Sequence, residues 1–91
     1  MTATLDELEA RVEALRRYLA CAEADLYEAQ GDTDGAKWKR AEAVGDRDAS
    51  TTHWVRFMAR AHLRDGTTPP ENSYRPDLIL AVMDEIRKET P

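Results

Sequence analysis

The chain has 91 residues, of which 42% are hydrophobic and 34% are charged, and its formal net charge is −5. This length holds one domain over residues 1–91 with a modest core, and the apolar content excludes a wholly disordered chain. The acidic balance disfavours non-specific binding to nucleic acid or anionic lipid, and the abundance of Ala, Leu, Glu and Arg favours an all-α fold over a sheet.

The first predicted element is a long helix over about residues 5–30. Thr4 followed by Glu7 has the spacing of a capping box, and neither Gly nor Pro interrupts the chain before Gly31. Apolar residues recur along this stretch at alternating spacings of three and four, which is typical of a helix with one continuous apolar stripe. We call this stripe the N-terminal seam, and it consists of Leu5, Leu8, Val12, Leu15, Leu19, Ala22, Leu26 and Ala29.

The two halves of this helix differ in character. From Tyr18 to Tyr27 most faces carry small or apolar residues, so we expect this second half to be the more buried, with both tyrosines packed beside the seam. The acidic first half is then the part left free to meet a partner. The seam itself has two interpretations, because either later helices of the same chain or a second chain can cover it.

A turn and a short second helix follow. The cluster of Gly and Asp over residues 31–35 predicts the turn, and residues 35–44 predict the helix, with Trp38 as its core anchor. Because the connection is short, the first two helices are expected to form an antiparallel hairpin.

A third helix is predicted over about residues 51–64. Ser50, Thr51 and Thr52 are its candidate N-terminal caps, and Gly66 stands where a left-handed C-terminal cap is common. A locally basic stripe runs along this helix at a spacing of four residues and consists of Arg56, Arg60 and Arg64.

A last helix is predicted over about residues 76–89, after a proline-containing loop over 66–75. Pro76 suits the first helical position, and an amphipathic stripe begins at Leu78. The sequence therefore predicts a small all-α bundle of three to four helices, built on the long N-terminal helix in its hairpin, with the last helix packed against that hairpin.

No pattern in the sequence indicates catalysis, a cofactor or a metal site. His53 and His62 are nine residues apart and fall on opposite sides of one helix, and the single cysteine, Cys21, lies in mid-helix among acidic neighbours. A small all-helical enzyme that recruits Arg11, Lys39 and Arg47 is a third alternative, but we predict a protein without enzymatic activity.

The candidate partner-binding residues therefore lie on the seam and on the basic stripe. They are Leu5, Leu8, Val12, Leu15, Arg56, Arg60 and Arg64. The first hypothesis is a non-catalytic protein–protein interaction module, such as a small adaptor, an assembly or regulatory factor, or an inhibitor acting on a larger protein. Its partner is another protein or a second copy of the chain.

The charges beside the seam bear on how two copies would pair. In a parallel homodimer, Arg11 would face Arg16 of the second copy, which is a like-charge contact. An antiparallel homodimer is therefore the expected self-associated form.

The second hypothesis is a dimeric helix-turn-helix DNA-binding regulator that uses helix 51–64. Ala41 and Gly45 have the spacing of that motif, but Asp46 and Thr51 stand where apolar residues are expected, and the net charge opposes DNA binding. The chain shows no signal peptide or membrane-spanning run, and the single cysteine fits a reducing compartment, so we expect a cytoplasmic protein.

Overall fold

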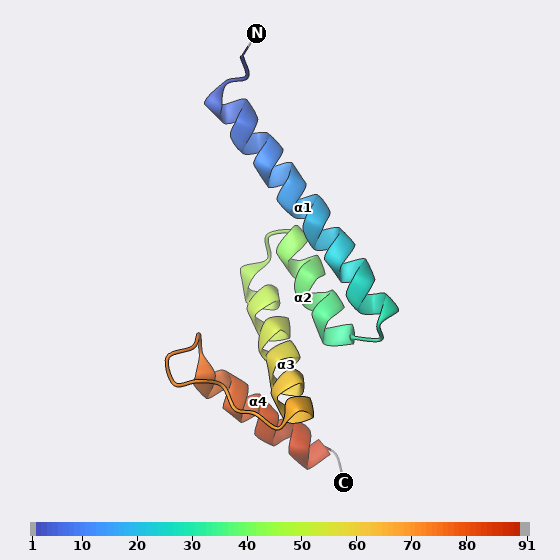
Figure 1. The fold of residues 1–91 in the computed structure, drawn as a ribbon, viewed down its shortest axis with the longest axis vertical. Helices are drawn as coiled ribbons and strands as arrows, with labels where there is room; N and C mark the ends of the chain where they lie inside the picture. The colour runs from blue at the N-terminus through green and yellow to red at the C-terminus, as the bar shows by residue number, and fades with distance from the viewer. Residues whose placement is uncertain (1, 90–91) are drawn as a thin grey trace.

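The structure is a computed structural model that describes residues 2–89, and it is all-α (Figure 1). Over these residues it contains four helices and no strand. They are α1 (Leu5–Ala29), α2 (Thr33–Ala43), α3 (Arg47–Asp65) and α4 (Pro76–Glu89). The predicted all-α fold, with a small bundle built on a long N-terminal helix, is confirmed. No helix in this range is both long and apolar enough to cross a lipid bilayer.

Local capping sets the ends of α1 and the start of α2. The Glu7 amide donates to Thr4 Oγ1 at 3.2 Å, as the capping-box spacing predicts. Gly31 then adopts a φ of 78°, a left-handed conformation that glycine enters without steric cost, and this turns the chain back. The Asp32 carboxylate accepts from the Gly35 amide at 2.9 Å and caps α2.

Close packing between α1 and α2 depends on small residues. Ala20 and Ala24 of α1 are buried, and a Cβ atom on Gly35 of α2 would stand 2.8 Å from the Tyr27 ring. The Tyr27 ring packs edge-on against Phe57 of α3, with the centroids 5.3 Å apart. These contacts hold the second half of α1 to α2 and α3.

A buried lysine also joins α1 to α2. The Lys39 ammonium lies 3.4 Å from the Glu23 carboxylate of α1 and 3.2 Å from that of Glu42, and 4.1 Å from the centroid of the Trp38 ring. The two carboxylates and the aromatic face compensate for burying the ammonium group.

Helix α3 begins earlier than the sequence predicted. Asp46 caps it by accepting from the Ala49 amide at 3.1 Å, so the helix starts at Arg47 and not near residue 51. The expected caps therefore lie inside the helix, where the Thr52 hydroxyl donates to the Asp48 carbonyl at 2.9 Å. Gly66 ends the helix with a φ of 70°, as predicted.

The main hydrophobic core lies between α3 and α4. Ile79 and Met83 are its largest fully buried side chains, and Val55 and Ala59 of α3 face them. Helix α4 packs on α3 and does not approach the α1–α2 hairpin, so the prediction that the last helix packs against that hairpin is wrong. Among the four helices of residues 2–89, only α3 covers the apolar stripe of α4.

The molecule is elongated because its helices pack in chain order. The backbones approach each other closely between α1 and α2, between α2 and α3, and between α3 and α4. The principal extents are 62 × 31 × 21 Å and the radius of gyration is 16.3 Å, against about 12 Å for a compact chain of this length. The first half of α1 projects away from the other helices (Figure 1).

Candidate functional site

The N-terminal seam faces solvent along its whole length. Every residue from 2 to 19 is exposed, and no later helix covers the first half of α1. Leu5 is 71% exposed, Leu15 67% and Leu19 59%. Large apolar side chains in a continuous exposed row mark interaction surfaces in soluble proteins. The structure thus leaves open the interpretation in which a second chain covers the seam.

A different stripe of α1 packs into the fold. Ala20, Ala24 and Tyr27 face α2 and α3, and at about 100° per residue their mean direction stands roughly 120° around the helix from the seam. The expectation that both tyrosines pack beside the seam is therefore wrong. Tyr27 packs on this second stripe, and Tyr18 is 75% exposed. Because the two stripes are separate, α2 does not block the seam.

Charged side chains flank the seam on both sides. In a heptad with Leu5 at position a, Glu9 and Arg16 occupy e positions on one flank, whereas Arg11 and Asp25 occupy g positions on the other. Among residues 2–89, neither Glu9 nor Arg16 forms an ion pair. These charges are available to a helix that docks along the seam.

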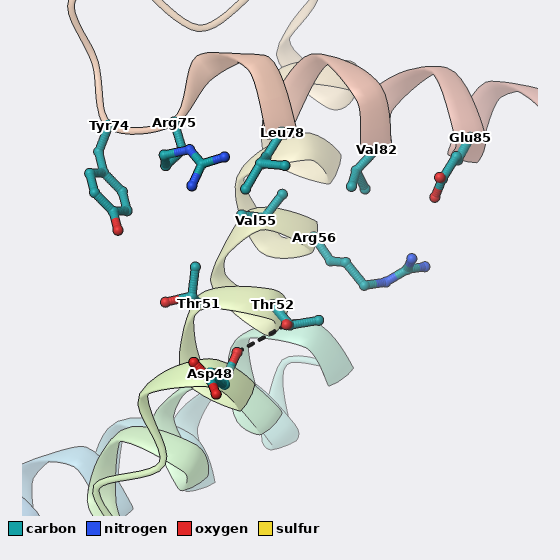
Figure 2. Close-up of a pocket in the computed structure, with 10 residues that line it drawn as sticks. All are labelled: Asp48, Thr51, Thr52, Val55, Arg56, Tyr74, Arg75, Leu78, Val82 and Glu85. Atoms are coloured by element: carbon teal, nitrogen blue, oxygen red, sulfur yellow. Dashed lines mark hydrogen bonds between the residues drawn. The ribbon is translucent and has the colours of Figure 1, made fainter.

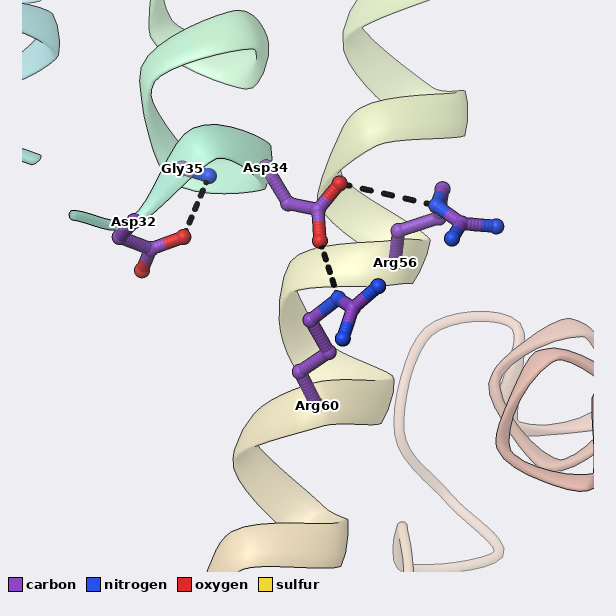
Figure 3. A network of polar contacts seen from close by, with 5 residues as sticks. All are labelled: Asp32, Asp34, Gly35, Arg56 and Arg60. Carbon is purple, nitrogen blue, oxygen red and sulfur yellow. Dashed lines mark hydrogen bonds and ion pairs between the residues drawn. The ribbon is translucent and has the colours of Figure 1, made fainter. Parts of the chain in front are cut away.

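The basic stripe of α3 is largely engaged within the chain. The Asp34 carboxylate of α2 lies between Arg56 and Arg60, with its oxygens 3.6 Å and 2.6 Å from the respective Nε atoms (Figure 3). Asp34 is largely buried, and Arg64 lies 3.3 Å from its neighbour Asp65. The three arginines therefore do not form one free basic surface, and two of them fasten the first turn of α2 to α3.

A groove of about 570 Å³ runs between α3 and the start of α4 (Figure 2). Its walls mix apolar and polar side chains, and its two carboxylates, Asp48 and Glu85, stand at opposite ends. At one end the Tyr74 ring packs against Trp54, with centroids 5.7 Å apart. The carboxylates are thus too dispersed to act as a catalytic pair.

An ion pair at the edge of the groove shifts the pKa values of both of its members, Arg75 and Asp77. The Arg75 guanidinium donates to the Asp77 carboxylate at 3.3 Å, and this hydrogen bond lowers the pKa of Asp77 and raises that of Arg75. Arg75 has a φ of 50° and directly precedes Pro76, which disfavours the right-handed helical conformation there. The pair stabilises the chain where it enters α4.

The residues considered as metal ligands lie apart. Cys21 is exposed on α1, whereas the His62 Nδ1 atom lies 2.8 Å from the Thr67 hydroxyl at the end of α3. Within residues 2–89, no group of three His, Cys, Asp or Glu side chains converges as a metal site.

Sequence reasoning missed the two polar anchors of the fold. The sequence indicates Asp34 only as a turn or cap residue, and Lys39 only as a member of a possible enzyme site with Arg11 and Arg47, whereas in the structure both form ion pairs between helices. Lys39 and Glu42 are three residues apart, but the pairs that join two helices are up to 26 residues apart along the chain, so no local pattern predicts them.

Comparisons with protein-family models, with curated proteins and with solved structures gave no significant match to this chain. Its function is therefore inferred from its own surface.

Proposed function

We propose that this protein is a non-catalytic interaction module that binds another protein chain through the N-terminal seam. The observation that carries the proposal is the continuous exposed row of apolar side chains on the projecting half of α1. Burying one leucine side chain contributes about 1.5–3 kcal/mol, so a partner that covers four of them has a large driving force.

The first half of α1 has no packing contacts with the other helices, which agrees with a role in binding another chain. Residues 5–19 have only local interactions, among them the Thr4 cap and an ion pair of 3.3 Å between Glu13 and Arg17. An isolated helix of this length is marginally stable in water, so docking would both bury the seam and stabilise the helix.

The alternative of a DNA-binding regulator has weaker support. Such a protein would present Arg56 and Arg60 to phosphate groups, and both already pair with Asp34. A small enzyme has weaker support still, because Arg11, Lys39 and Arg47 lie on three different helices and Lys39 is buried between carboxylates. We also propose a cytoplasmic location, since one exposed cysteine suits a reducing compartment.

The proposal is tested with two matched double variants of the full chain. Leu8→Lys with Leu15→Lys places two charges on the seam, whereas Ala10→Lys with Ala14→Lys places two on the outward face of the same exposed segment. Sedimentation of the purified protein and affinity capture from source lysate then report self-association and other partners.

We expect the wild-type chain and the alanine-site variant to bind a protein chain, and the seam variant to lose at least about tenfold in affinity, since each lysine removes one buried leucine from the interface. Equal binding by the seam variant would contradict the proposal. A wild-type chain that neither self-associates nor captures a stoichiometric partner would also contradict it.

A further inference from the structure

We infer that the chain which covers the N-terminal seam is a second copy of this protein, paired antiparallel through α1 with Leu8 opposite Leu19 and Val12 opposite Leu15. Leu5 then lies opposite Ala22. The inference rests on the proposed function and names its partner. It is carried by the exposure of the seam together with the pattern of charges that flanks it.

The seam has the geometry of a helix–helix contact. Its first six positions, from residue 5 to residue 22, span about 27 Å of helix. The proposed pairing places the large Leu5 against the small Ala22 at each end, and larger residues against each other in the middle. Since α2 packs on the separate stripe of α1, both copies can approach without displacing their hairpins.

Charge selects the antiparallel direction. In a parallel pair, Arg11 at position g faces Arg16 at position e of the second copy, and this occurs twice by symmetry. In antiparallel pairs, by contrast, e positions face e positions and g positions face g positions. Which flanking charges face each other then depends on the register of the two helices, and this register can shift in steps of one heptad.

Compared with the registers one heptad to either side, only the proposed one combines attraction with no like-charge contact. It sets Glu9 of each copy against Arg16 of the other, in two symmetric pairs. A shift of one heptad toward the N-terminus sets Glu9 against Glu9 and Arg11 against Arg11. A shift the other way sets Arg16 against Arg16 and Glu9 against Glu23, although it also brings Arg11 to Asp25.

The hydrophobic layers favour the same choice. The shift toward the C-terminus lengthens the overlap from six layers to eight and pairs Leu8 with Leu26, but four of its eight layers set Ala22 or Ala29 against a larger residue, compared with two of six in the proposed register. The shift toward the N-terminus shortens the overlap to four layers and leaves Leu19 without a counterpart. The proposed register buries the exposed leucines of the projecting half and pairs Glu9 with Arg16, neither of which has an ion-pair partner among residues 2–89.

A charge reversal in the full chain tests the pairing. Glu9→Arg and Arg16→Glu each convert two attractions into two repulsions, so each single variant is expected to raise the dimer dissociation constant about tenfold or more. The double variant restores attraction and is expected to dimerise as the wild type does. Arg17→Glu, one residue away on the outward face, is the matched control and is expected to leave the dimer nearly unchanged.

Disulfide crosslinking shows directly which residues of the two chains lie opposite each other. In a Cys21→Ser background, one chain carries Glu9→Cys and a second carries Arg16→Cys, and the two are mixed under mild oxidation. We expect mixed crosslinked dimers to dominate. Crosslinks between two Arg16→Cys chains, or between two Glu9→Cys chains, would instead indicate the shifted registers and overturn the proposed one.

Sedimentation separates this inference from the proposed function. A wild-type chain that stays monomeric at several hundred micromolar would overturn the homodimer. If that monomer still captured a different protein, and the seam variant did not, the interaction module would stand with another partner. Failure of the double charge variant to recover dimerisation, with circular dichroism showing intact helices, would overturn the register.

Discussion

The two ends of this protein use apolar side chains in opposite ways. At the C-terminal end, Ile79 and Met83 of α4 are fully buried against α3. At the N-terminal end, Leu5 and Leu15 of α1 are as apolar but stand in solvent on a projecting helix. Since both stripes have helical periodicity, the difference shows that periodicity identifies an apolar face and leaves its partner undetermined. One face forms the core, and the other remains available to another chain.

The largest expected effect is a difference in the free energy of unfolding between a substitution on the buried face of α4 and one on the exposed face of α1. Met83→Ala should lower the free energy of unfolding by about 3 kcal/mol, because it leaves a cavity in the core. Leu15→Ala should change it by less than about 0.5 kcal/mol, since that side chain is exposed in the monomer. Urea denaturation, at a concentration where sedimentation shows monomers, measures both. Similar losses of unfolding free energy in the two variants would contradict the conclusion that one face is buried and the other exposed.

The next prediction concerns the close packing of Gly35 in α2 against Tyr27 in α1. Gly35→Ala should destabilise the protein by about 1–2 kcal/mol, because the new Cβ atom would stand 2.8 Å from the Tyr27 ring. Helix propensity alone predicts the opposite, a gain of about 1 kcal/mol. Thermal unfolding decides between them. An unchanged or higher midpoint would mean that the second half of α1 is held more loosely than the structure indicates.

A smaller effect is expected where α2 is fastened to α3. Asp34→Asn removes the charge that pairs with Arg56 and Arg60, and should destabilise the protein by about 1 kcal/mol. Asp65→Asn, which removes the exposed partner of Arg64, is the matched control and should have an effect within about 0.5 kcal/mol. Urea denaturation at low and high salt compares the two variants. Equal effects would mean that the Asp34 network contributes no more than an ordinary surface pair.

The smallest effect concerns the pH dependence at the start of α4. The hydrogen bond from Arg75 lowers the pKa of Asp77, so the pair stabilises the fold above the ordinary aspartate pKa. This contribution is lost as the pH falls through the lowered value. Carboxyl NMR titration should place the Asp77 midpoint below the usual aspartate range, and Arg75→Gln should raise it. A midpoint that does not respond to Arg75→Gln would exclude this pair as the cause.

Some features of the fold follow from neighbouring residues and could be predicted from the sequence. The Thr4 cap and the end of α3 at Gly66 depend on contacts within a few residues. Pro76 begins α4, and the apolar stripe of that helix is the one that becomes buried. In each case the deciding interaction lies within one or two turns of helix, so the local sequence is sufficient.

The sequence also determined by itself that α1 carries an apolar seam with charged residues of both signs on its flanks. Only the tertiary structure decided which stripe of α1 is buried. The small residues Ala20 and Ala24 let α2 approach closely, whereas the leucines of the seam would hold it at a greater distance.

Tertiary structure likewise decided that α4 packs on α3 and that Asp34 pairs with Arg56 and Arg60. These choices join residues far apart in the chain, and they depend on how whole helices compete for one another's surfaces. That competition left the N-terminal seam uncovered, and its exposure is the physical basis of the proposed interaction.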